Sequence, residues 1–134
     1  MDQRCTQKPK IPCYVAIDDT KSANTVVGFI LMTMDYKLSK DGEKAVRSRM
    51  KDPTKPGGFG YINVVTVSRP YRGQGIGSHL LEHSISLGKL TPNTLAMTLH
   101  VDDENVRAME LYTRMGFKNV LKEGDDYLFA LYYS

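Results

Sequence analysis

Hydrophobic and polar residues follow one another along the chain in patterns that predict strands and helices in a fixed order. Stretches that are rich in β-branched residues, or that alternate between apolar and polar residues, predict strands. Apolar residues three and four positions apart predict helices. The segments predicted as strands are 13–19, 25–36, 61–68, 94–103, 117–124 and 125–133, and those predicted as helices are 75–87 and 105–115. The order β-β-β-α-β-α-β-β is typical of an α/β fold.

A turn with three glycines joins the strand at 61–68 to the helix at 75–87. Gly73, Gly75 and Gly77 stand within five positions, which is more glycine than a sharp turn requires. The first backbone N–H groups of a helix lack partners within the helix, and the helix dipole makes that end positive. The turn therefore indicates an anion site, most often one for phosphate.

Spacing separates three kinds of phosphate-binding turn. The nucleoside-triphosphate loop has a lysine and then Ser or Thr after its last glycine, whereas Ser78 and His79 follow Gly77 here. The dinucleotide turn has Gly-x-Gly-x-x-Gly, which GQGIGSHL does not match. The third pattern, Arg/Gln-x-x-Gly-x-Gly/Ala, is met by Arg72, Gly75 and Gly77. It resembles the acetyl-CoA loop of the GCN5-related N-acetyltransferase (GNAT) superfamily, with a purely structural turn as the alternative.

Length and composition are those of one globular domain. The chain has 134 residues, of which 41% are hydrophobic and 25% charged, and no apolar run approaches the ~20 residues that span a membrane. Residues 1–12 lack the apolar centre of a secretion signal, so we expect a short N-terminal tail and a cytoplasmic protein. Cys5 and Cys13 are too few for a disulfide framework or a zinc site, and we expect free thiols.

The net charge of the chain is +3, and a single segment has an excess of basic residues of the same size. Residues 39–58 hold six basic and three acidic residues. A net charge of this size does not indicate nucleic-acid binding. Because the segment has few apolar residues and ends in Pro and Gly, we expect a mobile, solvated loop between two strands. A basic flap over an anionic cofactor or partner is the alternative.

A second motif strengthens the resemblance to the GNAT superfamily. In DENVRAMELYTRMGF, Asn105 opens the predicted helix, Ala108 follows, Tyr112 lies seven residues after Asn105, and Gly116 and Phe117 close the helix. The resemblance implies a mostly antiparallel mixed sheet flanked by helices, in a single acetyltransferase domain, 1–134. The family usually begins with a strand and one or two helices, which form a wall of the acceptor groove. Only twelve residues stand in their place, so we expect these elements to be missing.

The resemblance also implies a cofactor site in which backbone amides hold the CoA pyrophosphate, with acetyl-CoA as co-substrate and no metal. The residues that it implies for acetyl-CoA binding are Val65, Val67, Arg72, Gly73, Gln74, Gly75, Ile76, Gly77, Ser78, Asn105 and Tyr112. Tyr112 would also protonate the departing thiolate, and Tyr127 would contact the acceptor. A tyrosine on an amphipathic helix is also explained by packing alone.

Two further catalytic residues are implied by the stretches YINVVTVSRPYR and LHVDDENVRA. These stretches look most like the protein N-terminal acetyltransferases, in which a Tyr and a His at matching places deprotonate the amine through water. Those roles fall on Tyr61 and His100. Histidine is also the side chain whose ordinary pKa suits a base at neutral pH. Two polar side chains packed on the sheet are the alternative.

The predicted function is transfer of an acetyl group from acetyl-CoA to a primary amine by direct attack in a ternary complex. The favoured acceptor is the α-amine of a protein or peptide N-terminus. A small-molecule amine, such as a polyamine or an amino sugar, is the alternative acceptor, and a non-catalytic acyl-CoA-binding module is the alternative outside enzymes. We expect no membrane partner and no nucleic-acid partner.

Overall fold

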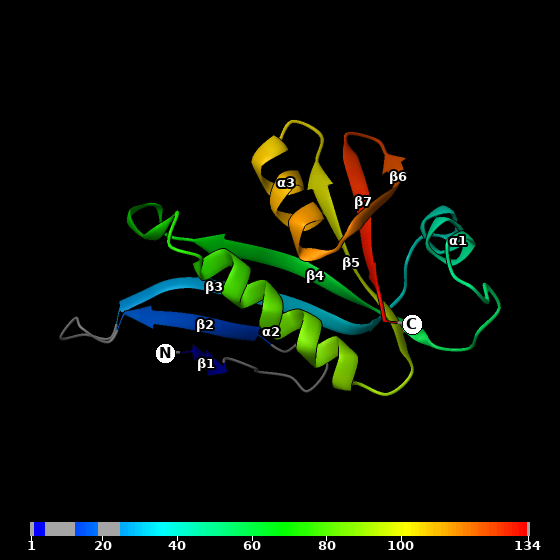
Figure 1. Ribbon diagram of the computed structural model, residues 1–134, viewed down its shortest axis with the longest axis horizontal. Helices are drawn as coiled ribbons and strands as arrows, with labels where there is room; N and C mark the ends of the chain where they lie inside the picture. The colour runs from blue at the N-terminus through cyan, green and yellow to red at the C-terminus, as the bar shows by residue number, and fades with distance from the viewer. Residues whose placement is uncertain (1, 5–12, 19–24, 134) are drawn as a thin grey trace.

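The computed structural model describes residues 2–4, 13–18 and 25–133, which form one mixed sheet with helices on both of its faces (Figure 1). Its strands are β1 (Asp2–Arg4), β2 (Cys13–Asp18), β3 (Thr25–Tyr36), β4 (Gly58–Val67), β5 (Thr94–Asp102), β6 (Lys118–Glu123) and β7 (Asp126–Tyr132). Its helices are α1 (Lys40–Ser48), the 3₁₀ turn η1 (Arg69–Tyr71), α2 (Ile76–Leu90) and α3 (Val106–Met115). The predicted α/β class is confirmed.

The strands follow the order β1-β2-β3-β4-β5-β7-β6 across the sheet. Neighbouring strands are antiparallel except for β4 and β5, which are parallel. Parallel neighbours need a long crossover connection, and here that connection is the glycine turn followed by α2. The mostly antiparallel mixed sheet that the resemblance implied is therefore present.

The alternation of side chains along β5 and β7 divides the core into two layers. Met97 and Leu99 pack with Leu80 of α2 and Tyr112 of α3 on one face of the sheet. Ala96 and the β7 residues Leu128 and Ala130 face the other way, where they pack with Val46 of α1. Successive residues of a strand point to opposite faces, so α1 lies on the face opposite to α2 and α3.

The pairing between β4 and β5 ends halfway along the two strands. Their parallel pairing begins at Gly58 with Thr94 and ends at Ile62 with Leu99. At this point β4 carries an extra residue, Asn63, because Ile62 and Val64 pair with consecutive residues of β3. A bulge bends the strand that carries it. Figure 1 shows β5, β6 and β7 turning away from β2, β3 and β4, which leaves an opening between β4 and β5.

The segment 39–58 contains α1, so the prediction that it is an irregular loop is wrong for residues 40–48. Ser39 caps the helix by accepting a hydrogen bond from the N–H of Gly42 at 2.9 Å. Glu43 and Arg47 form an ion pair at 2.7 Å on successive turns. Val46 is completely buried and anchors the helix to the sheet. One buried apolar side chain among charged ones gives too weak a periodicity to predict a helix.

The N-terminal part of the chain also differs from two expectations. The predicted tail contains β1, which pairs with β2 through Asp2 and Ala16, so the N-terminal strand that we expected to be missing is present. Cys13 is disulfide-bonded, so the prediction of a free thiol there is wrong; Cys5 lies outside the described residues. Among the described residues, no helix is long and apolar enough to cross a membrane.

Candidate active site

The glycine turn has the backbone conformation that its sequence predicts. Gly73 and Gly75 both have φ of 81°, a left-handed conformation that other residues rarely adopt. Gly75 is the N-cap of α2 and provides no side-chain hydrogen bond to the helix. The first N–H groups of α2 therefore point toward the turn with the positive end of the helix dipole behind them.

A cleft of ≈ 540 Å³ lies between this turn and α3. The predicted cofactor residues that line it are Val67, Arg72, Gly73, Gly75, Ile76, Gly77, Ser78 and Asn105. Gln74 lies in the same turn and is exposed. Sequence reasoning missed Arg107 and Arg114, which line the cleft from α3. Together with Arg72 they give the cleft three guanidinium groups, which are well suited to phosphate oxygens.

A second cavity, of ≈ 280 Å³, lies in the opening between β4 and β5. The predicted residues Val65, His100, Asn105 and Tyr112 line it. Asn105 also lines the cleft at the glycine turn, so it borders both spaces at the start of α3. The side chain of Asn105 caps α3 by accepting a hydrogen bond from the N–H of Ala108 at 3.2 Å, which gives it a structural role at the same position.

Tyr112 lines this opening from α3. Its side chain is 8% exposed, and its ring packs edge-on against Phe117 and Phe129. Burial raises the pKa of Tyr112 above the ordinary tyrosine value. The phenol is therefore protonated at neutral pH, which is the state that a proton donor requires.

Tyr61 and His100 form a hydrogen-bonded pair on the face opposite to α2. Tyr61 pairs with Thr98 in the sheet register, so the side chain of His100 lies on the same face as Tyr61. The distance from Tyr61 Oη to His100 Nδ1 is 2.6 Å. His100 Nε2 lies 2.9 Å from Glu123 Oε1, and Ser39 donates a hydrogen bond of 2.9 Å to Glu123 Oε2. The structure thus joins the two predicted residues into a longer chain of polar groups.

The charge states of Glu123 and Tyr61 determine where the protons lie in this series of hydrogen bonds. The hydrogen bond from His100, followed by the one from Ser39, holds the pKa of Glu123 below its usual range. Burial, together with Tyr36, Asp126 and Glu123, raises the pKa of Tyr61 to about 12. A carboxylate only accepts hydrogen bonds, and a neutral phenol donates its proton. His100 Nε2 therefore donates to Glu123, and Nδ1 accepts from Tyr61.

A third cavity, of ≈ 260 Å³, surrounds this chain of polar groups. Tyr36, Leu38, Ser39, Tyr61, His100, Glu123 and Asp126 line it. Its two carboxyl groups favour a cationic ligand, so we name it the acidic cavity. The ring of Tyr36 stacks on Tyr61 with centroids 4.2 Å apart. Because His100 lines both the acidic cavity and the β4–β5 opening, it stands between the two spaces.

Tyr127, which was predicted to contact the acceptor, is not among the residues that line the acidic cavity. It packs with the core on the α2 and α3 face, whereas its neighbour Asp126 lines the acidic cavity. The ammonium group of Lys122 lies 5.6 Å from the centre of the Tyr127 ring. Contact between Tyr127 and an acceptor stays a prediction.

Comparison with known proteins places this geometry in a family. The model of the acetyltransferase (GNAT) family matches residues 2–117. The chain is 28% identical over 110 residues to peptidyl-lysine N-acetyltransferase YjaB of Salmonella typhimurium, an alignment that covers 82% of this chain and 52% of YjaB. It is 38% identical over 58 residues to the N-alpha-acetyltransferase MAK3 of Arabidopsis thaliana, covering 43% of this chain and 30% of MAK3. The chain thus spans about half or less of the length of these two curated relatives.

A solved structure has the same fold. The structure of Arabidopsis thaliana NAA60 in complex with acetyl-CoA matches with a TM-score of 0.78 and 24% identity, over 93% of this chain and 77% of NAA60. Because the family model covers most of the sequence and the sheet diverges where the candidate residues lie, the chain belongs to the acetyltransferase (GNAT) family.

Proposed function

We propose that the protein transfers an acetyl group from acetyl-CoA to the α-amine of a peptide or protein N-terminus. The observation that carries the proposal is the hydrogen bond between Tyr61 and His100, which lies where β4 and β5 diverge. On one side of His100 is the β4–β5 opening, which shares Asn105 with the cleft at the glycine turn, and on the other is the acidic cavity. Donor and acceptor would approach the pair from these two sides.

The residues of the cleft fit a CoA-type ligand. The backbone N–H groups at Gly75, Ile76 and Gly77 suit a pyrophosphate at a helix N-terminus, and the guanidinium groups of Arg72 and Arg107 add positive charge. Beyond Ile62, β4 has no partner on its β5 side, so its edge can hydrogen-bond the amides of an extended arm. The thioester of acetyl-CoA supplies an electrophilic acetyl carbon.

Tyr61 and His100 would remove the proton that the amine loses. A phenol with a raised pKa is a poor base by itself. Tyr61 Oη can accept a proton from the amine, directly or through water, while its own proton passes over 2.6 Å to His100 Nδ1. The imidazolium that results is stabilised by the carboxylate of Glu123. The amine nitrogen then forms its bond to the acetyl carbon as the carbon–sulfur bond breaks.

Tyr112 would supply the proton that the departing thiolate takes. It lines the β4–β5 opening on the α3 side, whereas Tyr61 lines the acidic cavity. The acid and the base are therefore two different groups in two different spaces. A raised pKa keeps the Tyr112 phenol protonated until the thiolate forms.

The acidic cavity and the comparisons support an α-amine as the acceptor. The carboxyl groups of Glu123 and Asp126 would attract an ammonium group. An α-amine ordinarily has a pKa of about 8, against about 10.4 for lysine, so an imidazole base deprotonates it more easily at neutral pH. MAK3 is named as an N-alpha-acetyltransferase, which agrees with this choice, whereas YjaB is named for peptidyl-lysine.

A panel of matched acceptors tests the proposal. The protein is incubated with acetyl-CoA and one of three acceptors: a peptide with a free N-terminus and no lysine, the same peptide N-terminally blocked with one lysine added, or a polyamine. We expect thiol release and a mass increase of one acetyl group only with the first acceptor. Transfer only to lysine or to the polyamine would overturn the α-amine. Binding of acetyl-CoA without thiol release to any acceptor would favour a non-catalytic module.

A further inference from the structure

We infer that Glu123 is a positioning residue for His100, and that α1 holds Glu123 in place through the hydroxyl of Ser39. The inference rests on the proposed function, because it assigns Glu123 to the proton path through Tyr61 and His100 that the proposal needs, which we call the relay. It concerns Glu123 at the end of β6 and Ser39, the N-cap of α1, and the sequence indicated neither residue. The carboxylate of Glu123 binds His100 with one oxygen, at 2.9 Å, and Ser39 with the other, also at 2.9 Å.

The contact with His100 fixes which ring nitrogen carries the proton. With Nε2–H donating to the carboxylate, the lone pair of Nδ1 faces the Tyr61 hydroxyl, as the proton path requires. Among the described residues, the charged groups that line the cavity around the pair are the carboxyl groups of Glu123 and Asp126, and the ring of Tyr36 stacks on Tyr61. Of the two carboxyl groups, Glu123 makes the hydrogen bond with the imidazole. Glu123 therefore both orients the ring and stabilises its cation.

The contact with Ser39 ties this carboxylate to α1. The Ser39 hydroxyl donates to Glu123 and accepts from the N–H of Gly42, so one group both caps the helix and holds the carboxylate. α1 packs closely here, because a Cβ added at Gly42 would lie 2.9 Å from Ser39 Oγ and 3.2 Å from Leu128 Cδ2. The positive end of the α1 dipole also favours a carboxylate at this position.

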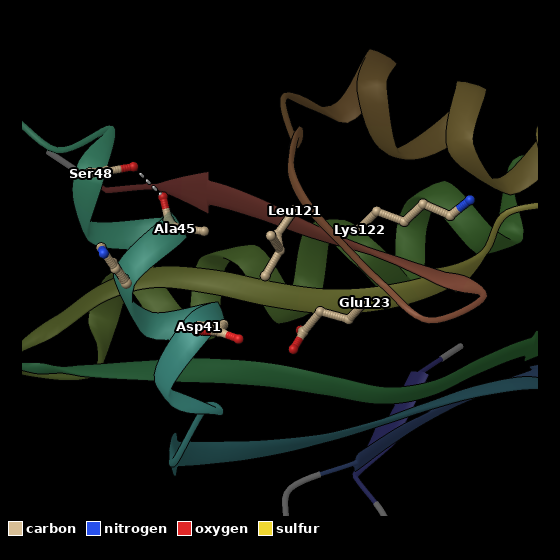
Figure 2. Close-up of a pocket in the computed structure, with 7 residues that line it drawn as sticks. Asp41, Ala45, Ser48, Leu121, Lys122 and Glu123 are labelled. Atoms are coloured by element: carbon tan, nitrogen blue, oxygen red, sulfur yellow. Dashed lines mark hydrogen bonds between the residues drawn. The ribbon is translucent and has the colours of Figure 1, made fainter.

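Figure 2 shows Glu123 extending from β6 toward α1, beside Asp41. These two residues line a cavity of ≈ 480 Å³ between α1 and β6, and Glu123 also lines the acidic cavity. At the far end of α1, Arg47 donates hydrogen bonds to the carbonyls of Pro53 and Lys55. Side-chain hydrogen bonds thus hold α1 at both ends. At its N-terminal end, the contact is with Glu123, which binds His100.

An NMR measurement tests the positioning independently of activity. In ¹⁵N-labelled protein, we expect a His100 Nε2–H resonance near neutral pH, assigned by its loss in His100→Ala. Glu123→Ala should remove it through exchange with water. Asp126→Asn is the matched control, because it removes a nearby carboxylate without touching this hydrogen bond, and it should keep the resonance. A resonance that survives unchanged in Glu123→Ala would overturn the inference.

Kinetics then test what the positioning does. Removal of a carboxylate that orients a histidine costs on the order of 10–100-fold where such pairs support metal ligands, and we expect Glu123→Ala to lower kcat in that range with the KM for acetyl-CoA unchanged. Glu123→Gln keeps the acceptor oxygen but not the charge, so we expect a smaller loss of kcat and an acid limb of the pH profile moved to lower pH. Glu82→Gln, on the exposed side of α2, should match the wild type.

Substitutions at Ser39 test the role of α1 separately from that of the Glu123 carboxylate. We expect Ser39→Ala to lower kcat several-fold and Ser39→Thr, which keeps the hydroxyl, to restore most of the rate. A folded Glu123→Gln protein with wild-type kcat and pH profile would overturn the inference. If the wild type acetylates no α-amine while Glu123→Ala still loses the Nε2–H resonance, the proposed function fails and the positioning stands.

Discussion

Replacing Tyr61 by phenylalanine removes a phenol that the fold holds in its neutral form. Burial, with Tyr36 and the carboxyl groups of Asp126 and Glu123, raises the pKa of Tyr61 to about 12, whereas a tyrosine in an unfolded chain ionises near 10. Between these values the folded state keeps a proton that the unfolded state has lost. The contribution of Tyr61 to stability is therefore complete below pH 10 and is lost as the pH rises toward 12.

The size of this effect on the free energy of unfolding follows from the pKa shift of Tyr61. About two pKa units correspond to at most about 2.7 kcal/mol at 1.36 kcal/mol per unit. Because the side chain is only partly buried, solvent screening reduces the effect, and we expect about 1 kcal/mol. The substitution also removes the hydrogen bond to His100, which costs about 0.5–1.5 kcal/mol.

Urea unfolding of wild type and Tyr61→Phe at pH 8 and pH 11 measures the difference. We expect the variant to be less stable at pH 8 by about the value of the lost hydrogen bond, and we expect this gap to narrow at pH 11. Tyr133, whose pKa burial also raises, contributes equally to both proteins. If the gap in unfolding free energy is the same at both pH values, the surroundings of Tyr61 do not raise its pKa and the reasoning from burial is wrong.

Substitutions at two further positions test the cofactor side of the site. A Cβ added at Gly77 would lie 3.7 Å from Val67 Cγ2 and 4.0 Å from Leu111 Cδ2, so we expect Gly77→Ala to fold normally, and the extra methyl groups of Gly77→Val to weaken acetyl-CoA binding at least tenfold, about 1.4 kcal/mol. Calorimetry that finds wild-type affinity in folded Gly77→Val would remove the turn from the site. For Tyr112→Phe we expect a lower kcat, by up to ~10²–10⁴-fold, with an unchanged Kd for acetyl-CoA. Equal kcat values in the two proteins would mean that Tyr112 only packs.

The sequence predicted those parts of the molecule that local patterns encode. The strand–turn–helix unit around Gly75 was predicted because its glycines have a conformational role that few residues can fill. α3 was predicted with its ends, since Asn105 caps it and Gly116, with φ of 109°, ends it. Tyr61 and His100 were chosen through a family resemblance, and the sheet register explains why they meet.

The remaining parts depend on contacts between distant segments, which no local pattern shows. α1 was missed because Val46 provides its only buried apolar side chain, among residues that are mostly charged. Glu123 and Ser39 were missed because a hairpin and a helix bring them to His100 from elsewhere in the sequence. The disulfide of Cys13 was missed because two cysteines by themselves do not indicate pairing.

The rate of α-amine acetylation by wild type and His100→Ala from pH 6 to 9.5 tests the central claim most directly. Acetylated peptide is counted by mass spectrometry, and melting temperatures confirm that both proteins are folded. If His100 receives the proton of the amine, the variant will be slow at neutral pH and will partly recover at high pH, where the amine loses its proton to solvent. A His100→Ala protein with the wild-type rate and the wild-type pH profile would contradict the relay.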